Sequence, residues 1–302
     1  MRILITGGTG FIGAQLCERL LQEQHQLLVL TRRPERVPSP IEAVVSLDQL
    51  DGSLYFDVVI NLAGEGIASK RWTEGQKLEI VESRLNTTRA LIAYFKRAQR
   101  KPSLLISGSA IGYYGIGDAS GGVDASAPVD EDGTGDESFS SELCQQWEAV
   151  AREASELGIR TCLLRTGIVL GRGGALAKML PPFKLGLGGV VGSGRQWMPW
   201  IHRADLVGII LHCMGNETVQ GAINGTAPNP VSNREFVRTL GRVLGRPTWL
   251  PLPAFIVRLL LGQMGEELLL AGRRIVPRKA LDTAYCFQYP HLEPALAQVL
   301  GK

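Results

Sequence analysis

Thr6-Gly7-Gly8-Thr9-Gly10-Phe11-Ile12-Gly13 decides the fold of this chain. The stretch follows a short apolar run and opens a segment of helical periodicity that reaches Gln24. Glycines spaced Gly-x-x-Gly-x-x-Gly between a strand and a helix are typical of a turn that binds dinucleotide phosphates. Gly7 permits the tight turn, Gly10 lets backbone N–H groups reach a pyrophosphate, and Gly13 lets the helix pack close to the strand.

The start of this helix should attract anions. A helix N-terminus carries a partial positive charge and unpaired N–H groups. We therefore predict that Thr9, Phe11 and Ile12 join the three glycines in contacting the cofactor. The alternative is a glycine turn without a ligand.

The end of the second predicted strand distinguishes NAD from NADP. An Asp or Glu there would bind the ribose 2′-hydroxyl and repel a 2′-phosphate. This chain has Thr31-Arg32-Arg33 instead. A guanidinium pairs with a phosphate through two parallel hydrogen bonds, and Thr31 adds a hydroxyl donor. The sequence thus predicts NADP(H) as the cofactor, with Arg32 on the 2′-phosphate. The alternative is that both arginines are solvated loop charges.

Strand-length apolar runs alternate with helix-length periodic segments in the first part of the chain. This alternation predicts an α/β protein with a parallel, doubly wound sheet, the NAD(P)-binding Rossmann fold. The expected strands are Arg2–Thr6, Leu27–Thr31, Asp57–Leu62, Ser103–Ser107 and Arg160–Arg165, and the expected helices are Phe11–Gln24, Thr73–Arg97 and Ser138–Leu157. A further helix is expected at 204–214 and a strand at 222–225.

The amino-acid composition of the chain changes after about residue 170. Gly and Pro are dense from 171 to 199, and helical segments with Pro-rich joints follow. We expect a Rossmann domain at 1–230, with 171–200 contributing to the cleft, and a small C-terminal helical domain at 231–302 that closes over the cofactor. The apolar stretch 254–271 is interrupted by charges, so an amphipathic packing helix is expected rather than a membrane span.

The overall charge excludes some classes of partner. The 302 residues carry 32 basic and 29 acidic side chains, a net charge of +3, so neither nucleic acid nor a membrane is an expected partner. Acids cluster at 116–137 and basic residues at 272–279, which we interpret as two solvated surface segments. The five cysteines form no CxxC pair and no metal-ligand spacing, which indicates reduced thiols in a cytoplasmic protein without a metal site.

Several longer stretches carry a family resemblance. They are Thr6–Gly13, Asn61-Leu62-Ala63-Gly64-Glu65, Arg71-Trp72, Ser83-Arg84, Ser107–Gly115, Leu164–Gly171, Pro182–Gly189, Gly192–Trp197 and Trp200-Ile201-His202. The chain resembles the extended short-chain dehydrogenase/reductases, and within them an atypical branch called the epimerase family proteins. Bacterial members are also labelled NADP-dependent oxidoreductases, and some relatives carry cell-division names. The tail from Leu250 to Leu281 resembles the small C-terminal domain of this branch, whose role is not established.

The resemblance implies further cofactor contacts. Leu62, Ala63 and Gly64 should line the adenosine and ribose side of the cofactor. Glu79 and Arg84 match positions that contact NADP in this branch, although each would otherwise be read as a surface helix charge. Val169 should lie near the nicotinamide. By the same resemblance the protein is a monomer or a homodimer.

The catalytic pattern of the wider superfamily is incomplete in this chain. Its members use a Ser with a Tyr-x-x-x-Lys pair, in which Lys lowers the pKa of the Tyr. Ser109 matches the Ser, but Ser140 and Cys144 stand at the Tyr and Lys positions, and no Tyr-x-x-x-Lys occurs. Tyr113 and Tyr114 are alternative phenol donors, and His202 could supply a proton near neutral pH. Structural packing remains the alternative for each.

The substrate pattern also departs from the family. Nucleotide-sugar enzymes often carry an Arg where Met198 stands, so a nucleotide sugar is not expected. Trp197, Met198 and Trp200 suggest an apolar wall for the substrate, with His202 beside it, unless the tryptophans belong to the lobe core.

Two functions stay open. The first is an NADP(H)-dependent oxidoreductase or epimerase acting on an unidentified small carbonyl or alcohol. The second is a non-catalytic NADP(H)-binding redox regulator linked to cell division. The acidic loop 116–137 is predicted to act as a lid, because loops at strand carboxyl ends border the ligand crevice of such folds.

Overall fold

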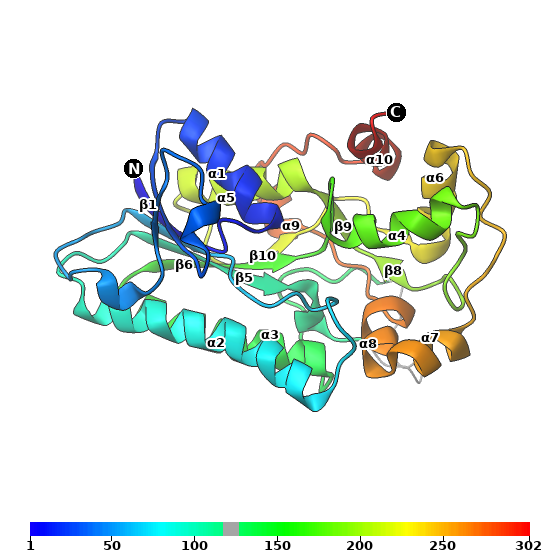
Figure 1. Ribbon diagram of the computed structural model, residues 1–302, viewed down its shortest axis with the longest axis horizontal. Helices are drawn as coiled ribbons and strands as arrows, with labels where there is room; N and C mark the ends of the chain where they lie inside the picture. The colour runs from blue at the N-terminus through cyan, green and yellow to red at the C-terminus, as the bar shows by residue number, and fades with distance from the viewer. Residues whose placement is uncertain (117–126) are drawn as a thin grey trace.

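Seven short strands rich in Val, Ile and Leu form one parallel sheet in the computed structural model, which describes residues 1–116 and 127–302 (Figure 1). The strands are β1 (Arg2–Thr6), β2 (Gln26–Leu30), β3 (Glu42–Val44), β4 (Val58–Asn61), β5 (Leu104–Ala110), β6 (Arg160–Thr166) and β10 (Gly221–Gly225). Their spatial order is β10-β6-β5-β4-β1-β2-β3. This order contains that of the dinucleotide-binding Rossmann sheet, with its crevice where the order reverses beside β1.

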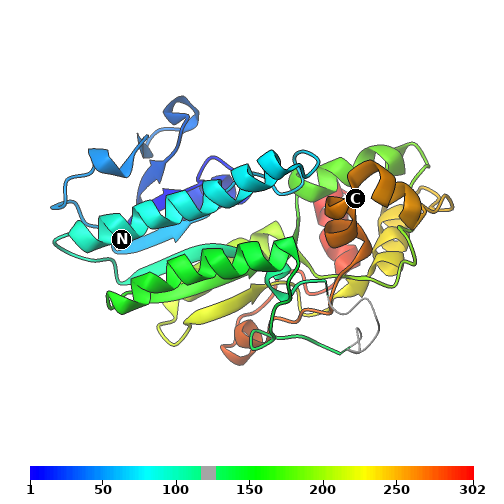
Figure 2. The same ribbon diagram turned by 90° about the horizontal axis from the view of Figure 1, so that it is seen from below.

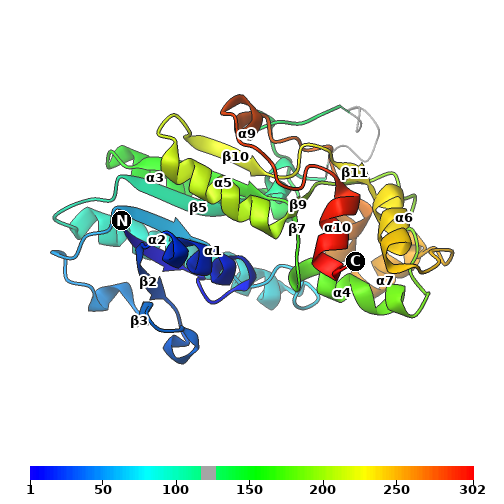
Figure 3. The same cartoon turned by 90° about the horizontal axis from the view of Figure 1, so that it is seen from above.

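Helices cover both faces of the sheet. Helices α1 (Phe11–Gln22) and α5 (Arg203–Gly215) lie on one face, and α2 (Glu74–Arg97) and α3 (Phe139–Glu156) lie side by side on the other (Figures 2 and 3). Alternate side chains of β1 enter two separate cores, because successive residues of a strand point to opposite faces. Ile3 and Ile5 pack with α1 and α5, whereas Leu4 packs with α2. The doubly wound α/β fold is therefore confirmed.

A smaller lobe forms at one end of the sheet and has its own core. Its helices are α4 (Gly174–Lys184), α6 (Asn233–Leu244) and α10 (Leu292–Leu300), and two short strand pairs join them: β7 (Ile168–Leu170) with β9 (Trp200–His202), and β8 (Trp197–Met198) with β11 (Val231–Ser232). Trp200, Phe236 and Leu296 are fully buried in this core. The lobe is thus built from residues 168–200 together with the chain beyond residue 230.

The C-terminal part of the chain does not stay within the lobe. Helix α9 (Arg278–Asp282) returns to the sheet, where Ala280 is buried in the same core as Ile3. The division of the chain at residue 230 therefore stays a prediction.

The expectation of a single packing helix over residues 254–271 is wrong. The structure has α7 (Ala254–Leu261), α8 (Gln263–Gly265) and a π-helical turn, Glu266–Leu270. Gly262 separates the first two with φ +57°, in the left-handed region that favours glycine. No helix within the described residues is long and apolar enough to cross a membrane.

Candidate functional site

The glycine turn after β1 has the geometry expected of a phosphate site. Gly7 has φ +72°, and a Cβ there would lie 2.6 Å from the carbonyl oxygen of Leu62. A Cβ on Gly13 would lie 2.7 Å from the Cα of Gly8 and would overlap the carbonyl oxygen of Gly7. Among the described residues, no side chain caps the helix that begins after Gly10. The N–H groups of its first turn are therefore available to an anion.

A second glycine segment packs on this turn. Phe11 opens α1, and a Cβ on Gly171 or Gly174 would lie 2.8 Å from a carbon of its ring. Arg203 donates a 3.2 Å hydrogen bond to the carbonyl oxygen of Phe11, and its guanidinium lies 4.8 Å from the ring centroid. The loop after β7 therefore reaches the phosphate turn across the top of the sheet.

The other predicted cofactor residues surround the same turn. Ile12, Leu62 and Val169 are partly buried and pack against the core that contains α1. Thr9 is exposed at the tip of the turn. Val169 belongs to β7, so its contact with this core brings the lobe strands next to the Rossmann sheet.

A buried chain of hydrogen bonds supports the segment after β4. The Thr6 hydroxyl donates to Asn61 Oδ1 at 2.6 Å and accepts from the Ala63 N–H at 3.1 Å. Asn61 Nδ2 then donates to Thr88 Oγ1 at 2.9 Å, and Trp147 Nε1 donates to the same oxygen at 3.0 Å. Because these polar groups are paired in a buried region, the network fixes Leu62-Ala63-Gly64 beside the phosphate turn.

Arg84 and Glu79 lie in different surroundings, although both belong to α2. The Arg84 guanidinium lies 5.2 Å from the Trp147 ring, and a Cβ on Gly64 would lie 3.1 Å from its Cζ. Burial lowers the pKa of Arg84. Glu79 is exposed and lies 3.8 Å from Lys70 Nζ. Arg84 is thus next to the predicted adenosine segment, whereas Glu79 lies on the surface.

The predicted 2′-phosphate residues lie at the carboxyl end of β2. Arg32 is exposed, and no carboxylate lies within 4.0 Å of it among the described residues. Thr31 Oγ1 accepts a 3.1 Å hydrogen bond from the Arg33 N–H, and the Thr31 N–H donates to Val44 of β3. Strand β3 was not predicted, and it holds the backbone from which Arg32 projects.

Ser109 contacts a buried ion pair formed by Glu148 and Arg165. The Ser109 hydroxyl donates a 2.8 Å hydrogen bond to Glu148 Oε1. Arg165 Nε and Nη2 donate to the two oxygens of the same carboxylate at 2.8 and 2.9 Å, and both charged side chains are only 2% exposed. A hydroxyl has one donor proton, so Ser109 in this arrangement can accept a further hydrogen bond but cannot donate one.

The two tyrosines predicted as phenol donors differ in burial. Tyr114 is fully buried, donates to Asn224 Oδ1 at 2.7 Å and accepts from Arg165 Nη1 at 3.0 Å. Burial raises the pKa of Tyr114 to about 12. Tyr113 is partly exposed, and the Arg165 guanidinium lies 3.4 Å from its ring centroid. Of the two, Tyr113 is the one that a substrate can reach.

Ser140 and Cys144, which the sequence comparison predicts at the Tyr and Lys positions, have structural contacts. Cys144 is buried, which raises the pKa of its thiol to about 11. Ser140 Oγ donates to Glu267 Oε2 at 2.6 Å, and the Ser140 N–H donates to the same oxygen at 2.9 Å. The Phe139 N–H donates to the other oxygen at 3.3 Å, so Glu267 caps the start of α3 from 127 residues away in the sequence.

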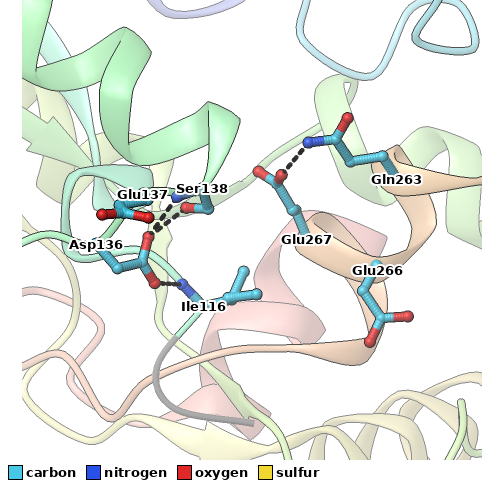
Figure 4. Close-up of a pocket in the computed structure, with 7 residues that line it drawn as sticks. All are labelled: Ile116, Asp136, Glu137, Ser138, Gln263, Glu266 and Glu267. Atoms are coloured by element: carbon cyan, nitrogen blue, oxygen red, sulfur yellow. Dashed lines mark hydrogen bonds between the residues drawn. The ribbon is translucent and has the colours of Figure 1, made fainter.

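A pocket of about 440 Å³ opens beside this cap. Figure 4 shows the first turn of α3 on one side of it and the helical turn that carries Glu266 and Glu267 on the other. Gln263 Nε2 donates to Glu267 Oε1 at 2.8 Å. Asp136 and Glu137 also line the pocket, so its walls are acidic.

The predicted substrate residues are distributed between the lobe surface and the lobe core. Trp197 and Met198 are partly exposed on β8, and the Arg274 guanidinium lies 5.2 Å from the Trp197 ring. Trp200 is fully buried in the lobe core, and His202 is buried at the start of α5. Burial lowers the pKa of His202. Only Trp197 and Met198 are placed to contact a molecule from solvent.

The acidic and basic segments meet, so their interpretation as two solvated surface segments is wrong. Arg278 pairs with both Asp130 and Asp132. Glu131 is buried and accepts from the backbone N–H groups of Asn224 and Lys279. Residues 117–126 of the predicted lid lie outside the described residues. Hydrogen bonds and ion pairs join residues 129–132 to the C-terminal segment.

Three important side chains were not proposed as site residues from the sequence. They are Glu148, Arg165 and Glu267. An arginine within the apolar run Cys162-Leu163-Leu164-Arg165 is a usable signal, because a buried guanidinium requires an acidic partner. No local pattern indicates the partner of Glu267.

The parallel sheet, the glycine turn and the crevice beside β1 define a dinucleotide-binding protein of the Rossmann class. The sequence model of the NAD dependent epimerase/dehydratase family matches residues 3–224, and the chain belongs to this family. A second match, to a domain of unknown function called DUF1731, covers residues 252–299.

Relatives align over nearly their full lengths. Human epimerase family protein SDR39U1 is 38% identical over 307 residues, covering 100% of both chains. Epimerase family protein YfhF of Bacillus subtilis (strain 168) is 37% identical, covering 100% of this chain and 98% of the relative. The Arabidopsis thaliana chloroplastic homologue of SDR39U1 is 38% identical, covering 99% and 87%.

Solved structures agree with these relatives. The crystal structure of human SDR39U1 with NADPH has a TM-score of 0.89 over 100% of both chains, at 38% identity. A nucleoside-diphosphate sugar epimerase from Corynebacterium glutamicum has a TM-score of 0.77 at 29% identity, and the match covers 100% of this chain and 58% of that one.

Proposed function

We propose that this protein binds NADP(H) and uses it to oxidise a small alcohol or reduce a small carbonyl compound. The observation that carries the cofactor assignment is Arg32, exposed and without an acidic partner among the described residues, at the strand end where an NAD enzyme has Asp or Glu. The NADPH in the crystal structure of the human relative supports the same assignment.

In this proposal Gly7, Gly10 and Gly13 hold the pyrophosphate with Thr9, Phe11 and Ile12. Leu62, Ala63, Gly64 and Arg84 border the adenosine and ribose. Val169 borders the nicotinamide. Glu79 contributes least, because its side chain lies on the surface beside Lys70. The bound nicotinamide supplies or accepts the hydride, and the protein supplies position and polarity.

Ser109 is the proposed contact for the reacting oxygen of the substrate. Since its proton is donated to Glu148, Ser109 is arranged to accept a hydrogen bond from a substrate hydroxyl. Tyr113 is the proposed phenol next to it, because it is partly exposed whereas Tyr114 is buried and paired on both sides. Trp197 and Met198 are the proposed apolar wall, because both are partly exposed, whereas Trp200 is fully buried in the lobe core and His202 is hydrogen-bonded to Gln298.

The test is NADP⁺ reduction measured with a panel of small alcohols, together with NADPH oxidation measured with the corresponding carbonyl compounds. Ser109→Ala should lower the kcat of alcohol oxidation by about 10- to 100-fold, because the substrate hydroxyl loses its acceptor, while leaving the Kd for NADPH unchanged. Ser155→Ala is the matched control, because Ser155 is exposed on the same helix as Glu148. A panel that gives no turnover from protein that binds NADPH tightly would contradict the enzyme.

The alternative function is a non-catalytic NADP(H)-binding regulator. The observation that favours it is the pairing of Ser140 with Glu267, because Ser140 is the residue predicted at the position of the superfamily's acid–base Tyr. Turnover separates a regulator from an enzyme. The regulator binds NADPH but turns over no compound of the panel, with or without the Ser109→Ala substitution.

A further inference from the structure

Large apolar side chains are exposed at the end of the molecule farthest from β2 and β3. We call this the apolar tip, and it comprises Leu185, Leu187, Trp249, Phe255, Leu259 and Leu260. Trp249 is 84% exposed and Leu259 is 72% exposed. Exposed patches of this kind on a folded protein mark an interaction site.

Backbone hydrogen bonds join the two segments that carry the apolar tip. The Leu252 N–H donates a 2.8 Å hydrogen bond to the carbonyl oxygen of Val190, and the Gly192 N–H donates a 2.9 Å bond to the carbonyl oxygen of Leu252. These bonds bring the loop after α4 next to the loop before α7. Figures 1 and 3 show α4, α6 and α7 together at this end of the molecule.

Helix α7 shows why the surface is uncovered. Val257 is buried and faces the protein. Phe255 and Leu259 are four residues apart, so they share the opposite face of the helix, and both are exposed. Within the described residues, no segment of this chain covers that face.

Helix α6, at the same end of the molecule as the apolar tip, carries a row of arginines (Figures 1 and 3). Residues 227–265 contain five arginines and one acid, Glu235; of these arginines, Arg258 pairs with Glu266 just beyond the range. Arg234, Arg238 and Arg242 recur at every fourth residue of α6 and are exposed, and Arg246 follows the helix. Arg242 pairs with Glu293. Among residues 1–116 and 127–302, no carboxylate lies within 4.0 Å of Arg238, Arg246 or Lys184.

We propose that the apolar tip docks on an anionic lipid surface. Trp and Phe side chains favour the boundary between lipid headgroups and acyl chains, and Leu side chains lose their water contact there. The neighbouring arginines then face anionic headgroups, which attract basic residues near a membrane surface. This association is peripheral and needs no membrane-spanning helix. It is independent of the function proposed for the cofactor site.

The charge pattern favours lipid over a second copy of this chain. A symmetric dimer places the same patch on both sides of the interface, so it brings together two surfaces that carry the same basic side chains without carboxylate partners among the described residues, Arg238, Arg246 and Lys184. An anionic lipid surface brings the opposite charge to the same residues. The net charge of the whole chain conceals this feature, because acids at 116–137 offset the local excess of arginine.

Co-sedimentation with vesicles tests the proposal. The full-length protein should bind vesicles of phosphatidylglycerol and phosphatidylcholine, should bind pure phosphatidylcholine weakly, and should lose affinity as salt increases. Leu259→Glu should weaken binding about ten-fold or more, because an inserted side chain becomes charged. Arg238→Gln and Arg246→Gln should each weaken binding about five-fold. Val45→Glu is the matched control, since Val45 is an exposed apolar residue beside β3.

The controls separate docking from misfolding and from dimerisation. All four substitutions are at exposed positions, so thermal unfolding should be unchanged. Failure to bind anionic vesicles at low salt overturns the proposal, as does equal weakening by Leu259→Glu and Val45→Glu. If light scattering finds a dimer that Leu259→Glu dissociates, while wild-type protein ignores the vesicles, a second copy occupies the tip and the lipid proposal is wrong.

Discussion

The hydroxyl of Ser109 donates a 2.8 Å hydrogen bond to Glu148 Oε1, the carboxylate oxygen that Arg165 Nε also contacts at 2.8 Å. Ser109 and Arg165 are neighbours in register on β5 and β6, and Glu148 reaches both from α3. The side chain proposed to meet the substrate therefore rests on a buried ion pair, and the stability of the fold and the geometry of the site depend on the same carboxylate.

Glu148→Ala should lower the free energy of unfolding by about 3–5 kcal/mol, because it leaves the Arg165 charge buried without its partner. Urea unfolding measures this change. Arg152→Ala is the control: Arg152 contacts the same carboxylate at 3.2 Å from an exposed position, so its loss should cost less than about 1 kcal/mol. Equal losses of unfolding free energy in the two variants would contradict a larger contribution from the buried pair.

Gly13→Ala should disrupt the phosphate turn, because the added Cβ overlaps the carbonyl oxygen of Gly7. We expect a loss of about 1–3 kcal/mol in unfolding free energy and weaker binding of NADPH by calorimetry. Gly75→Ala provides the comparison, since a Cβ at Gly75 meets nothing within 4 Å near the start of α2. That variant should be unchanged or slightly more stable.

Glu267→Ala tests the contact between the C-terminal segment and α3. Removing the carboxylate leaves the N–H groups of Phe139 and Ser140 without their acceptor, so the protein should lose about 0.5–2 kcal/mol of stability. Hydrogen exchange at these two amides should accelerate in the folded state. Glu266→Ala is the matched control on the same turn: Glu266 pairs with exposed Arg258, so its loss should leave exchange at α3 unchanged.

His202 should make the protein less stable in mild acid. Burial lowers the pKa of His202 below its usual value of 6.5, with Gln298 and Asp205 opposing the shift. The unfolded chain then binds more protons than the folded one below 6.5, so stability falls as the pH falls from 6.5 toward the folded pKa. His202→Asn keeps a side chain that can cap α5 but removes the titration.

The check is chemical unfolding of the wild type and His202→Asn at about pH 7.5 and about pH 5.5. His25 and His212 also have lowered pKa values, so the wild type alone does not isolate His202. The difference between the two proteins does. An identical pH dependence in both would contradict the assignment.

Periodicity in the sequence predicted the central strands and helices to within a few residues, because each has one or two apolar faces. It missed β3, which has three residues and includes the charged Glu42. It also missed the break at Gly262, since an apolar run continues on both sides of that residue.

The site was predictable where its residues are adjacent in the sequence. The glycine turn and Thr31-Arg32 are of this kind. Glu148 with Arg165, Ser140 with Glu267, and Glu131 with Asn224 are pairs from distant segments, and only the fold brings them together. A charged residue inside an apolar strand indicates that a partner exists but not which one.

Calorimetric titration of the purified protein with NADPH and with NADH tests the central claim most directly. The wild type should prefer NADPH, and Arg32→Ala should weaken NADPH binding about 10- to 100-fold, the value of a charge-assisted contact, while NADH binding changes little. Arg36→Ala, an exposed neighbour, should leave both unchanged. Equal loss for both nucleotides in Arg32→Ala, or no binding of either by the wild type, would contradict the account.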